Sequence, residues 1–158
     1  MTDLITLRRA TAADAVPLVP LIHRVLEVSN TPDYGAANVA RVQSHFTVDG
    51  VAGMIAACAV WVAVRADVLV GTASLGARSS DGTIVLRTFF VDPDIQRQGV
   101  GSKLLAVIED HARELDLAQL PVRSSIAGEP FYASHGYIAV EDHWDGDERT
   151  IQMVKSLI

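Results

Sequence analysis

The chain has 158 residues, of which 49% are hydrophobic and 20% are charged, as expected for one soluble globular domain over residues 1–158. Its net charge of −6 at pH 7 argues against a nucleic-acid partner, because binding to a phosphate backbone requires clustered cations. The single cysteine, Cys58, excludes an intrachain disulfide and a cysteine-based zinc site, so we expect no bound metal.

The N-terminal part of the chain is expected to contain one strand and two helices. Residues 4–9 alternate apolar and polar side chains, which is typical of a strand with one solvated face. Residues 14–29 carry apolar side chains at helical spacing and predict the first helix. Residues 30–35 contain turn-forming residues and predict a loop, and residues 36–46 predict a second helix. Residues 47–53 are interpreted as irregular because two glycines interrupt them.

Three strands are expected in the middle of the chain. Residues 59–64 and 68–75 are rich in β-forming side chains, and the short polar segment between them predicts an antiparallel hairpin. Residues 76–82 are interpreted as a polar turn and residues 83–91 as the next strand. Cys58 lies in an apolar run and is predicted to be a small buried hydrophobic residue.

A glycine-containing loop joins the strand at residues 83–91 to a helix that is predicted to extend to about residue 115. Gly99 and Gly101 fall where this helix begins, and residues without a Cβ allow a bulky anion to approach the backbone. The first N–H groups of a helix lack intrahelical partners and carry partial positive charge, so a phosphate or pyrophosphate is the natural occupant. Further along the helix, Glu109 and Arg113 are predicted to form an exposed pair.

Three strands are expected after this helix. Residues 119–124 form a short strand candidate, in which Pro121 argues against a fully hydrogen-bonded interior position. Residues 137–140 and 150–154 predict the last two strands, joined by an acidic loop at residues 141–148. No segment of the chain is interpreted as a signal peptide or a membrane span, so we expect a cytoplasmic protein without a membrane partner.

Two motifs resemble those of one enzyme family. The first matches Q/R-x-x-G-x-G/A, the pyrophosphate-binding signature of the GNAT superfamily of acyl-coenzyme A dependent N-acyltransferases; it consists of Gln96, Arg97, Gln98, Gly99, Val100 and Gly101. The second, residues 131–137, is similar to the family's F-Y-x-x-x-G-F/Y segment, in which Gly136 ends a short helix before a strand. Their order along the chain agrees with the family, and the resemblance extends over most of the sequence.

The resemblance implies an α/β fold of the α+β type, with a mixed, mostly antiparallel central sheet of about six to seven strands flanked by about four helices. It also implies transfer of an acetyl group from acetyl-CoA, as co-substrate, to a primary amine by direct attack in a ternary complex. Tyr132 would be the general acid for the departing thiolate. The residues implied to bind the coenzyme are Phe90, Val91, Gln96, Arg97, Gln98, Gly99, Val100, Gly101, Ser102 and Ser125.

The sequence departs from the family pattern at two positions. Ser125 stands where many members carry a coenzyme-binding asparagine, although a serine can still donate a hydrogen bond. Val85 stands where many members carry a glutamate base on the central strand, which leaves a base elsewhere, a water chain or no base. Other titratable residues near the second motif are interpreted as surface residues; they are His135, Glu141, Asp142 and His143.

Alternatives remain for the acceptor and for the activity. The acceptor would be an amine of a small molecule or peptide. The acidic residues within 141–148 favour a cationic acceptor, unless they simply form a solvated loop. A GNAT-fold acyl-CoA-binding sensor or complex subunit without turnover is the alternative to an enzyme, whereas a toxin that acetylates charged tRNA is disfavoured by the acidic balance. The resemblance also allows a homodimer.

Overall fold

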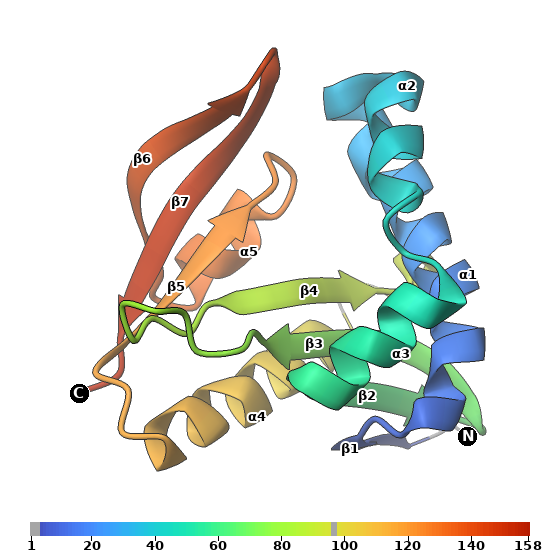
Figure 1. The fold of residues 1–158 in the computed structure, drawn as a ribbon, viewed down its shortest axis with the longest axis horizontal. Coiled ribbons are helices and arrows are strands. Elements are labelled where there is room, and N and C mark those ends of the chain that lie inside the picture. The colour runs from blue at the N-terminus through green and yellow to red at the C-terminus, as the bar shows by residue number, and fades with distance from the viewer. Residues whose placement is uncertain (1–3, 96–97) are drawn as a thin grey trace.

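The computed structural model describes residues 4–95 and 98–158 (Figure 1). Their strands form a 7-stranded sheet in the order β1-β2-β3-β4-β5-β7-β6. The strands are β1 (Ile5–Arg9), β2 (Ala59–Arg65), β3 (Val68–Leu75), β4 (Leu86–Val91), β5 (Gln119–Ser124), β6 (Ile138–Asp145) and β7 (Glu148–Ser156). The helices are α1 (Ala15–Val25), α2 (Thr31–Gln43), α3 (Val48–Ala57), α4 (Val100–Glu114) and α5 (Glu129–Ser134), with short helical turns at Ala12–Asp14, Leu26–Asn30 and Pro93–Ile95.

All neighbouring strands of this sheet are antiparallel except β4 and β5, which are parallel. The described parts of β4 and β5 share a single pair, Leu86 with Val122. The sheet therefore divides at this point, and β5, β7 and β6 turn away from the β1–β4 half (Figure 1). The predicted mixed, mostly antiparallel sheet flanked by helices is confirmed.

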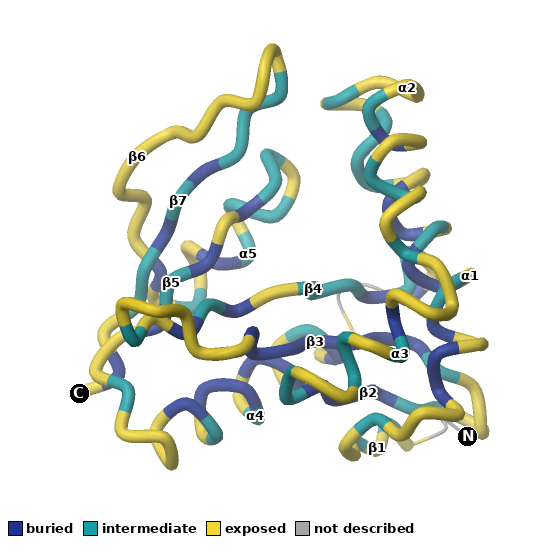
Figure 2. Tube along the Cα trace, viewed as in Figure 1, coloured by how far each residue is buried: buried dark blue, intermediate teal, exposed yellow. Residues whose placement is uncertain are grey.

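Each face of the sheet carries its own hydrophobic core. On one face, called here the α4 face, α4 and α5 bury side chains such as Leu104 and Tyr132 against β4 and β5. On the opposite face, called the α3 face, α1, α2 and α3 bury side chains such as Ile22 and Val51 against β2. Successive residues of a strand point to opposite faces, so the two cores separate the side chains of β4 into two sets. Figure 2 shows the buried positions along the inner sides of these layers.

The prediction of a loop at residues 30–35 is wrong. The chain stays helical from Leu26–Asn30 into α2, and the interruption is confined to Gly35, where φ is +82°. Pro32 is tolerated because it lies in the first turn of α2, where a backbone N–H has no intrahelical partner.

The prediction of an irregular segment at residues 47–53 is also wrong, because α3 begins at Val48. The Thr47 side chain caps this helix by accepting a hydrogen bond of 3.0 Å from the Gly50 N–H. Val51 is 1% exposed and packs into the core of the α3 face. Tertiary packing thus overrides the low helix propensity of the two glycines.

The acidic segment 141–148 is mostly strand instead of a loop. β6 continues to Asp145, the chain turns at Gly146 with a φ of +65°, and β7 begins at Glu148. Every residue of β6 is exposed, so the strand has no buried face. Its sequence therefore lacks the alternation of apolar and polar residues that would predict a strand. Backbone pairing with β7 holds it in place. The strand predicted at residues 83–91 is shorter than expected and begins at Leu86.

Candidate active site

β4 contains a bulge beside the point where the sheet divides. Ser74 of β3 pairs with Arg87 and Thr72 pairs with Phe90, so one β3 residue faces two residues of β4, one of which is Thr88. Thr88 has a φ of +53°, which is rare for a β-branched residue and is typical of strained backbone at functional sites. The Ser74 hydroxyl donates a hydrogen bond of 2.8 Å to the Arg87 carbonyl and holds one end of the bulge.

The half of β4 that follows Leu86 has no pairing with β5 in the described part of the chain. Backbone groups on such a strand edge can pair with an extended ligand, as in recognition by strand addition. Phe90, which was predicted to bind the coenzyme through its backbone, lies in this half, and its ring packs edge-on against Phe46 at 5.8 Å between centroids. Val91, predicted for the same role, is buried at the end of the strand.

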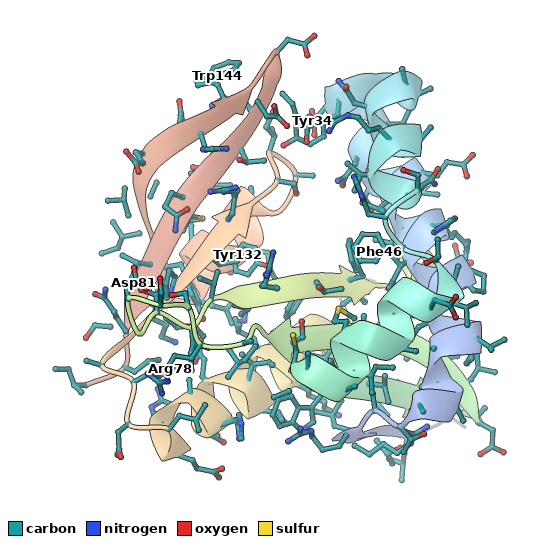
Figure 3. The ribbon with its side chains drawn as sticks, viewed as in Figure 1. Tyr34, Phe46, Arg78, Asp81, Tyr132 and Trp144 are labelled. Atoms are coloured by element: carbon teal, nitrogen blue, oxygen red, sulfur yellow. The ribbon has the colours of Figure 1, made fainter. Side chains whose placement is uncertain are left out.

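Tyr132 lies among aromatic side chains next to this part of β4 (Figure 3). Its ring centroid is 5.9 Å from that of Phe89, 5.4 Å from that of Phe131 and 5.5 Å from that of Tyr137. The residue is 6% exposed, and burial raises the pKa of its phenol well above the ordinary value. The phenol is therefore a protonated hydrogen-bond donor at neutral pH.

Different structural features explain why glycine occupies each of two positions at the start of α4. Gly99 precedes the helix with a φ of +84°, a left-handed conformation that side-chain-bearing residues adopt only at a cost. Gly101 instead faces an aromatic ring, since a Cβ there would lie 3.1 Å from Cε1 of Phe131. Close approach of Phe131 thus accounts for Gly101 in this structure. Of the other predicted loop residues, Val100 is buried, Gln98 and Ser102 are exposed, and Gln96 and Arg97 lie outside the described residues.

Ser102 contacts the second motif through His135. Its hydroxyl is 2.9 Å from Nε2 of His135, and Nδ1 of the same ring is 2.8 Å from the Phe131 carbonyl. A carbonyl only accepts, so we assign the proton to Nδ1 and the donation to the serine hydroxyl. This chain of hydrogen bonds joins the first turn of α4 to α5 on the α4 face.

Ser125 follows β5 and begins the turn that leads to α5. Its hydroxyl accepts a hydrogen bond of 3.1 Å from the Gly128 N–H, so it stabilises the turn. At Gly136, φ is +93°, which confirms the predicted left-handed residue at the end of the short helix.

A pocket of about 230 Å³ opens on the α3 face at the bulge. Its lining combines apolar side chains with a few polar ones: His45, Phe46, Gly50, Val51, Met54, Cys58, Ser74, Arg87 and Thr88. Sequence reasoning missed Arg87 and Thr88, because no motif marks them and the bulge depends on pairing with β3. Cys58 is half-buried and lines this pocket, which corrects the prediction of full burial. Val85, at the position of the family's glutamate, is half-buried and lies just before β4.

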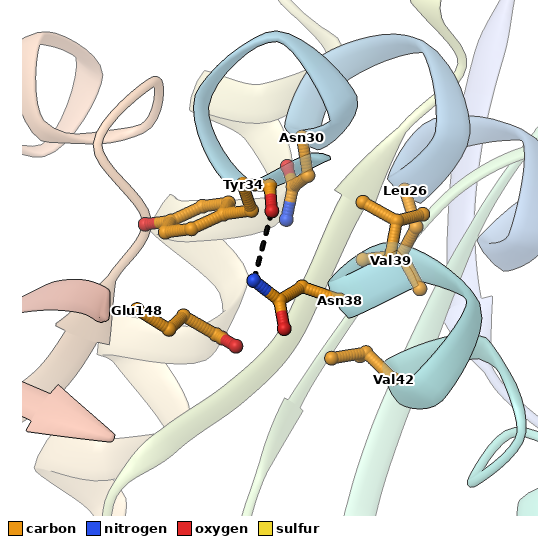
Figure 4. A pocket seen from close by; sticks show the side chains of 7 residues that line it. All are labelled: Leu26, Asn30, Tyr34, Asn38, Val39, Val42 and Glu148. Atoms are coloured by element: carbon orange, nitrogen blue, oxygen red, sulfur yellow. Dashed lines mark hydrogen bonds between the residues drawn. The ribbon is translucent and has the colours of Figure 1, made fainter. Parts of the chain in front are cut away.

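Contacts between α2 and β7 connect the β1–β4 half of the molecule with the half that contains β5, β7 and β6. The Tyr34 hydroxyl donates a hydrogen bond of 2.6 Å to the Arg149 carbonyl and accepts one of 2.9 Å from the Ile126 N–H. Arg41 of α2 also pairs with Glu148 at 2.7 Å. Figure 4 shows the small pocket that these elements enclose, lined by Leu26, Asn30, Tyr34, Asn38, Val39, Val42 and Glu148.

Three of the five acidic residues within 141–148 form ion pairs. Asp142 pairs with Arg149 at 3.0 Å, and Arg41 approaches both Glu148 and Asp145. In residues 4–95 and 98–158, no helix is long and apolar enough to cross a membrane, and no three potential metal-binding side chains of His, Cys, Asp or Glu gather at one site.

Comparison with solved structures shows the same fold. A GCN5-related N-acetyltransferase from Rhodopseudomonas palustris superposes with a TM-score of 0.87 at 22% identity, covering 99% of this chain and 98% of that one. The PaiA N-acetyltransferase from Thermoplasma acidophilum, solved in complex with coenzyme A, gives a TM-score of 0.85 at 15% identity, with coverage of 97% and 99%. An aminoglycoside 6′-N-acetyltransferase complexed with coenzyme A gives 0.67 at 15% identity, with 97% of both chains covered.

A search of curated proteins found no match. The family model for the acetyltransferase (GNAT) domain matches residues 30–157, which include the β4 bulge, the described start of α4 and the Tyr132 helix. Both motifs of the sequence lie within the match. The chain therefore belongs to the GNAT acetyltransferase family.

Proposed function

We propose that this protein transfers an acetyl group from acetyl-CoA to a primary amine of a small molecule or peptide. The observation that supports this best is the half of β4 that pairs with β3 but not with β5 among the described residues, with the Thr88 bulge on one side and Tyr132 close by. An extended pantetheine chain would add as a strand beside Phe90, and the pyrophosphate would bind at the N-terminus of α4. Two of the similar structures were solved with coenzyme A, which agrees with this donor.

In the proposed reaction the amine lone pair attacks the thioester carbonyl carbon, so a C–N bond forms while the C–S bond breaks. An N–H group at the β4 bulge would stabilise the oxygen that becomes negative. Sulfur leaves with the bonding electron pair and takes a proton from the Tyr132 phenol, which is then reprotonated from solvent. Overall, an ammonium ion and acetyl-CoA give an amide, coenzyme A thiol and one released proton.

The raised pKa of Tyr132 is compatible with this role. Burial disfavours the phenolate and so keeps Tyr132 protonated as a donor, and the same apolar surroundings disfavour a free thiolate, which raises the proton affinity of the departing sulfur. His135 is held on the α4 face by Ser102 and is therefore not placed to accept a proton from an amine on the α3 face. His45 lines the α3-face pocket and is the titratable side chain best placed to assist there.

Replacing Tyr132 by Phe tests the assignment. We expect kcat to fall by about 100-fold or more, because general acid catalysis contributes roughly 10²–10⁴-fold, while the Kd for coenzyme A stays within about twofold. Thiol release from acetyl-CoA with a panel of amines measures the rate, and titration calorimetry measures binding. Tyr137→Phe is the matched control, since this phenol bonds to Glu109 away from the β4 edge.

An unchanged kcat in Tyr132→Phe, with the chemical step rate-limiting, would remove Tyr132 from the mechanism. Coenzyme A binding without thiol release for any amine would favour the alternative, an acyl-CoA-binding sensor or subunit. Gly99→Glu adds a negative charge and strain at the start of α4, so it should abolish coenzyme A binding if the pyrophosphate lies there.

A further inference from the structure

The pocket on the α3 face, together with the two arginines beside it, indicates the chemical class of the acceptor, an inference that rests on the proposed function. The coenzyme would lie along the β4 edge towards α4, so the acceptor amine must reach the thioester from the other side of the bulge. The pocket of about 230 Å³ opens at Thr88 on that side. Its volume is below the roughly 300–1,000 Å³ typical of drug-sized ligands, which favours a small acceptor.

Arg87 brings a positive charge into this pocket. It directly precedes Thr88, and its aliphatic stem lies over Gly76, where a Cβ would come within 2.8 Å of its Cδ. Its guanidinium makes no ion pair with any residue that the structure describes. No carboxylate lines the pocket in the described chain.

A second arginine, Arg123, directly follows the residue of β5 that pairs with β4. Leu86 and Val122 pair across β4 and β5 and are both buried in the core of the α4 face. The next residues, Arg87 and Arg123, therefore point to the opposite face. Arg123 is exposed and, like Arg87, forms no ion pair within the described residues.

Arg87 and Arg123 are both exposed and neither has an ion-pair partner among the described residues, so both guanidinium groups are available to attract an anion. Guanidinium groups bind carboxylates by paired hydrogen bonds. Phe46, Val51 and Met54 give the pocket an apolar wall. The site thus combines an anion-binding edge, an apolar wall and the bulge where the acetyl group would be transferred.

We propose that the acceptor is a small amino acid-like amine whose carboxylate is bound by Arg87, with Arg123 contributing charge. Because Arg87 is adjacent to Thr88 along the strand, its backbone is only about 3.3 Å from the bulge. The flexible Arg87 side chain can therefore bind the carboxylate of a short acceptor, such as an α- or β-amino acid, whose amine lies at the bulge. The side chain of the acceptor would contact the apolar wall.

The acidic segment 141–148 suggests the opposite charge for the acceptor, but it lies on the other half of the sheet, and several of its carboxylates are paired with Arg41 and Arg149.

The experiment compares an anionic with a cationic acceptor directly. Thiol release from acetyl-CoA is measured with the common amino acids, their primary amides, β-alanine and the polyamine spermidine. The proteins are wild type, Arg87→Gln, Arg123→Gln and Arg65→Gln. Arg65 is the last residue of β2, whereas the pocket residue Cys58 lies just before the first, so Arg65 serves as the charge-matched control away from the pocket.

The expected result is a kcat/KM for at least one free amino acid more than tenfold above that of its amide. Arg87→Gln should raise the acceptor KM at least tenfold for the acid and less than twofold for the amide, leaving the KM for acetyl-CoA unchanged. Arg123→Gln should have a smaller effect in the same direction, and Arg65→Gln none. Equal use of acids and amides, a preference for spermidine, or a preference that survives Arg87→Gln would overturn the proposal.

The single cysteine provides a readout that does not need turnover. Cys58 lines the pocket, so a bound acceptor should slow its alkylation by iodoacetamide. If the protein acetylates nothing, protection by free amino acids that is lost in Arg87→Gln would still support the site, while the proposed function would fail. Absence of protection in the wild-type protein, together with no turnover of acids, would overturn the site as well.

Discussion

At the scale of single residues, Glu109 shows how a correct helix prediction can misplace a side chain. The predicted exposed pair of Glu109 and Arg113 is wrong. Glu109 is 7% exposed and accepts hydrogen bonds of 2.8 Å from the Tyr137 hydroxyl and 2.9 Å from Nζ of Lys155. Arg113 instead contacts Asp110 and the Leu157 carbonyl. Glu109 thus joins α4 to the start of β6 and to β7.

This arrangement predicts a large cost for Glu109→Ala. We expect the free energy of unfolding to fall by about 2–4 kcal/mol, because the change leaves a partly buried ammonium and a buried phenol without their acceptor. Urea denaturation measures the effect. Asp110→Ala is the matched control, since Asp110 forms only an exposed pair with Arg113 and should lose less than about 0.5 kcal/mol. Equal losses in the two variants would contradict the role assigned to Glu109.

Burial and the contact with Glu109 also change the pKa of the Tyr137 phenol. Burial is the main cause that raises the pKa of Tyr137, and the hydrogen bond to Glu109 adds to it. Tyr137 therefore remains a donor to Glu109 throughout the neutral pH range.

At the scale of elements, the start of the first helical segment depends on one carboxylate. Asp14 accepts hydrogen bonds of 2.7 and 2.9 Å from the Arg8 guanidinium and one of 2.7 Å from the Thr11 N–H. This is a capping box to which β1 contributes a cation. The hydrogen bonds from Arg8 are the largest cause that lowers the pKa of Asp14 below its ordinary value, against the opposing effect of burial.

Asp14 should therefore make stability depend on acid pH. Its pKa is lower in the folded than in the unfolded state, so its contribution is complete above the unfolded value of about 3.9 and is lost as the pH falls through the folded value. Asp14→Asn should cost about 1 kcal/mol at pH 7, and the difference from wild type should shrink below about pH 4. Urea denaturation across pH 3–7 measures this difference.

Asp33→Asn is the control for this series, because Asp33 is exposed near the start of α2. It should change stability by less than about 0.5 kcal/mol at every pH. The lowered pKa would be contradicted if the difference in unfolding free energy between wild type and Asp14→Asn grew as the pH fell.

At the scale of the whole molecule, the connection between α2 and β7 matters because β4 and β5 barely pair. Tyr34 bonds both to β7, through the Arg149 carbonyl, and to the segment after β5, through the Ile126 N–H. Its phenol thus joins α2, which packs on the α3 face, to the half of the sheet that contains β5 and β7, at a distance from the single Leu86–Val122 pair. The bridge limits how far the halves can separate around the proposed reaction site.

Tyr34→Phe removes this bridge without removing the ring. We expect amide exchange at Ile126 to speed up about five- to tenfold, since a hydrogen bond contributes about 1 kcal/mol, and the acceptor KM to rise. Hydrogen–deuterium exchange and steady-state kinetics are the measurements. Ser44→Ala serves as the control because its hydroxyl bonds to the Arg41 carbonyl within the same helix end. Unaltered exchange at Ile126 would show that the bridge is not needed to hold the halves together.

The sheet edge also bears on assembly. β6 forms one edge of the described sheet, and it exposes Ile138, Val140 and Trp144 at 70%, 62% and 58%. Exposed apolar edge strands are common sites of association. The homodimer expected from the family resemblance stays a prediction.

The sequence by itself determined the features that depend on neighbouring residues. It predicted the hairpin of β2 and β3, the helix α4, and the left-handed glycine that ends α5, and its two motifs identified the family. These features follow from side-chain alternation, helical spacing and glycine conformation, all of which act over a few residues.

Only the tertiary structure decided which groups meet at the candidate site. The bulge at Thr88 depends on the register between β3 and β4, and the placement of Arg87 and Arg123 on the same face depends on one pair between strands more than thirty positions apart in the sequence. The burial of Glu109 likewise requires β6 and β7 to reach α4. Such contacts form between distant segments, whose pairing is set by packing of the whole chain and leaves no local pattern in the sequence.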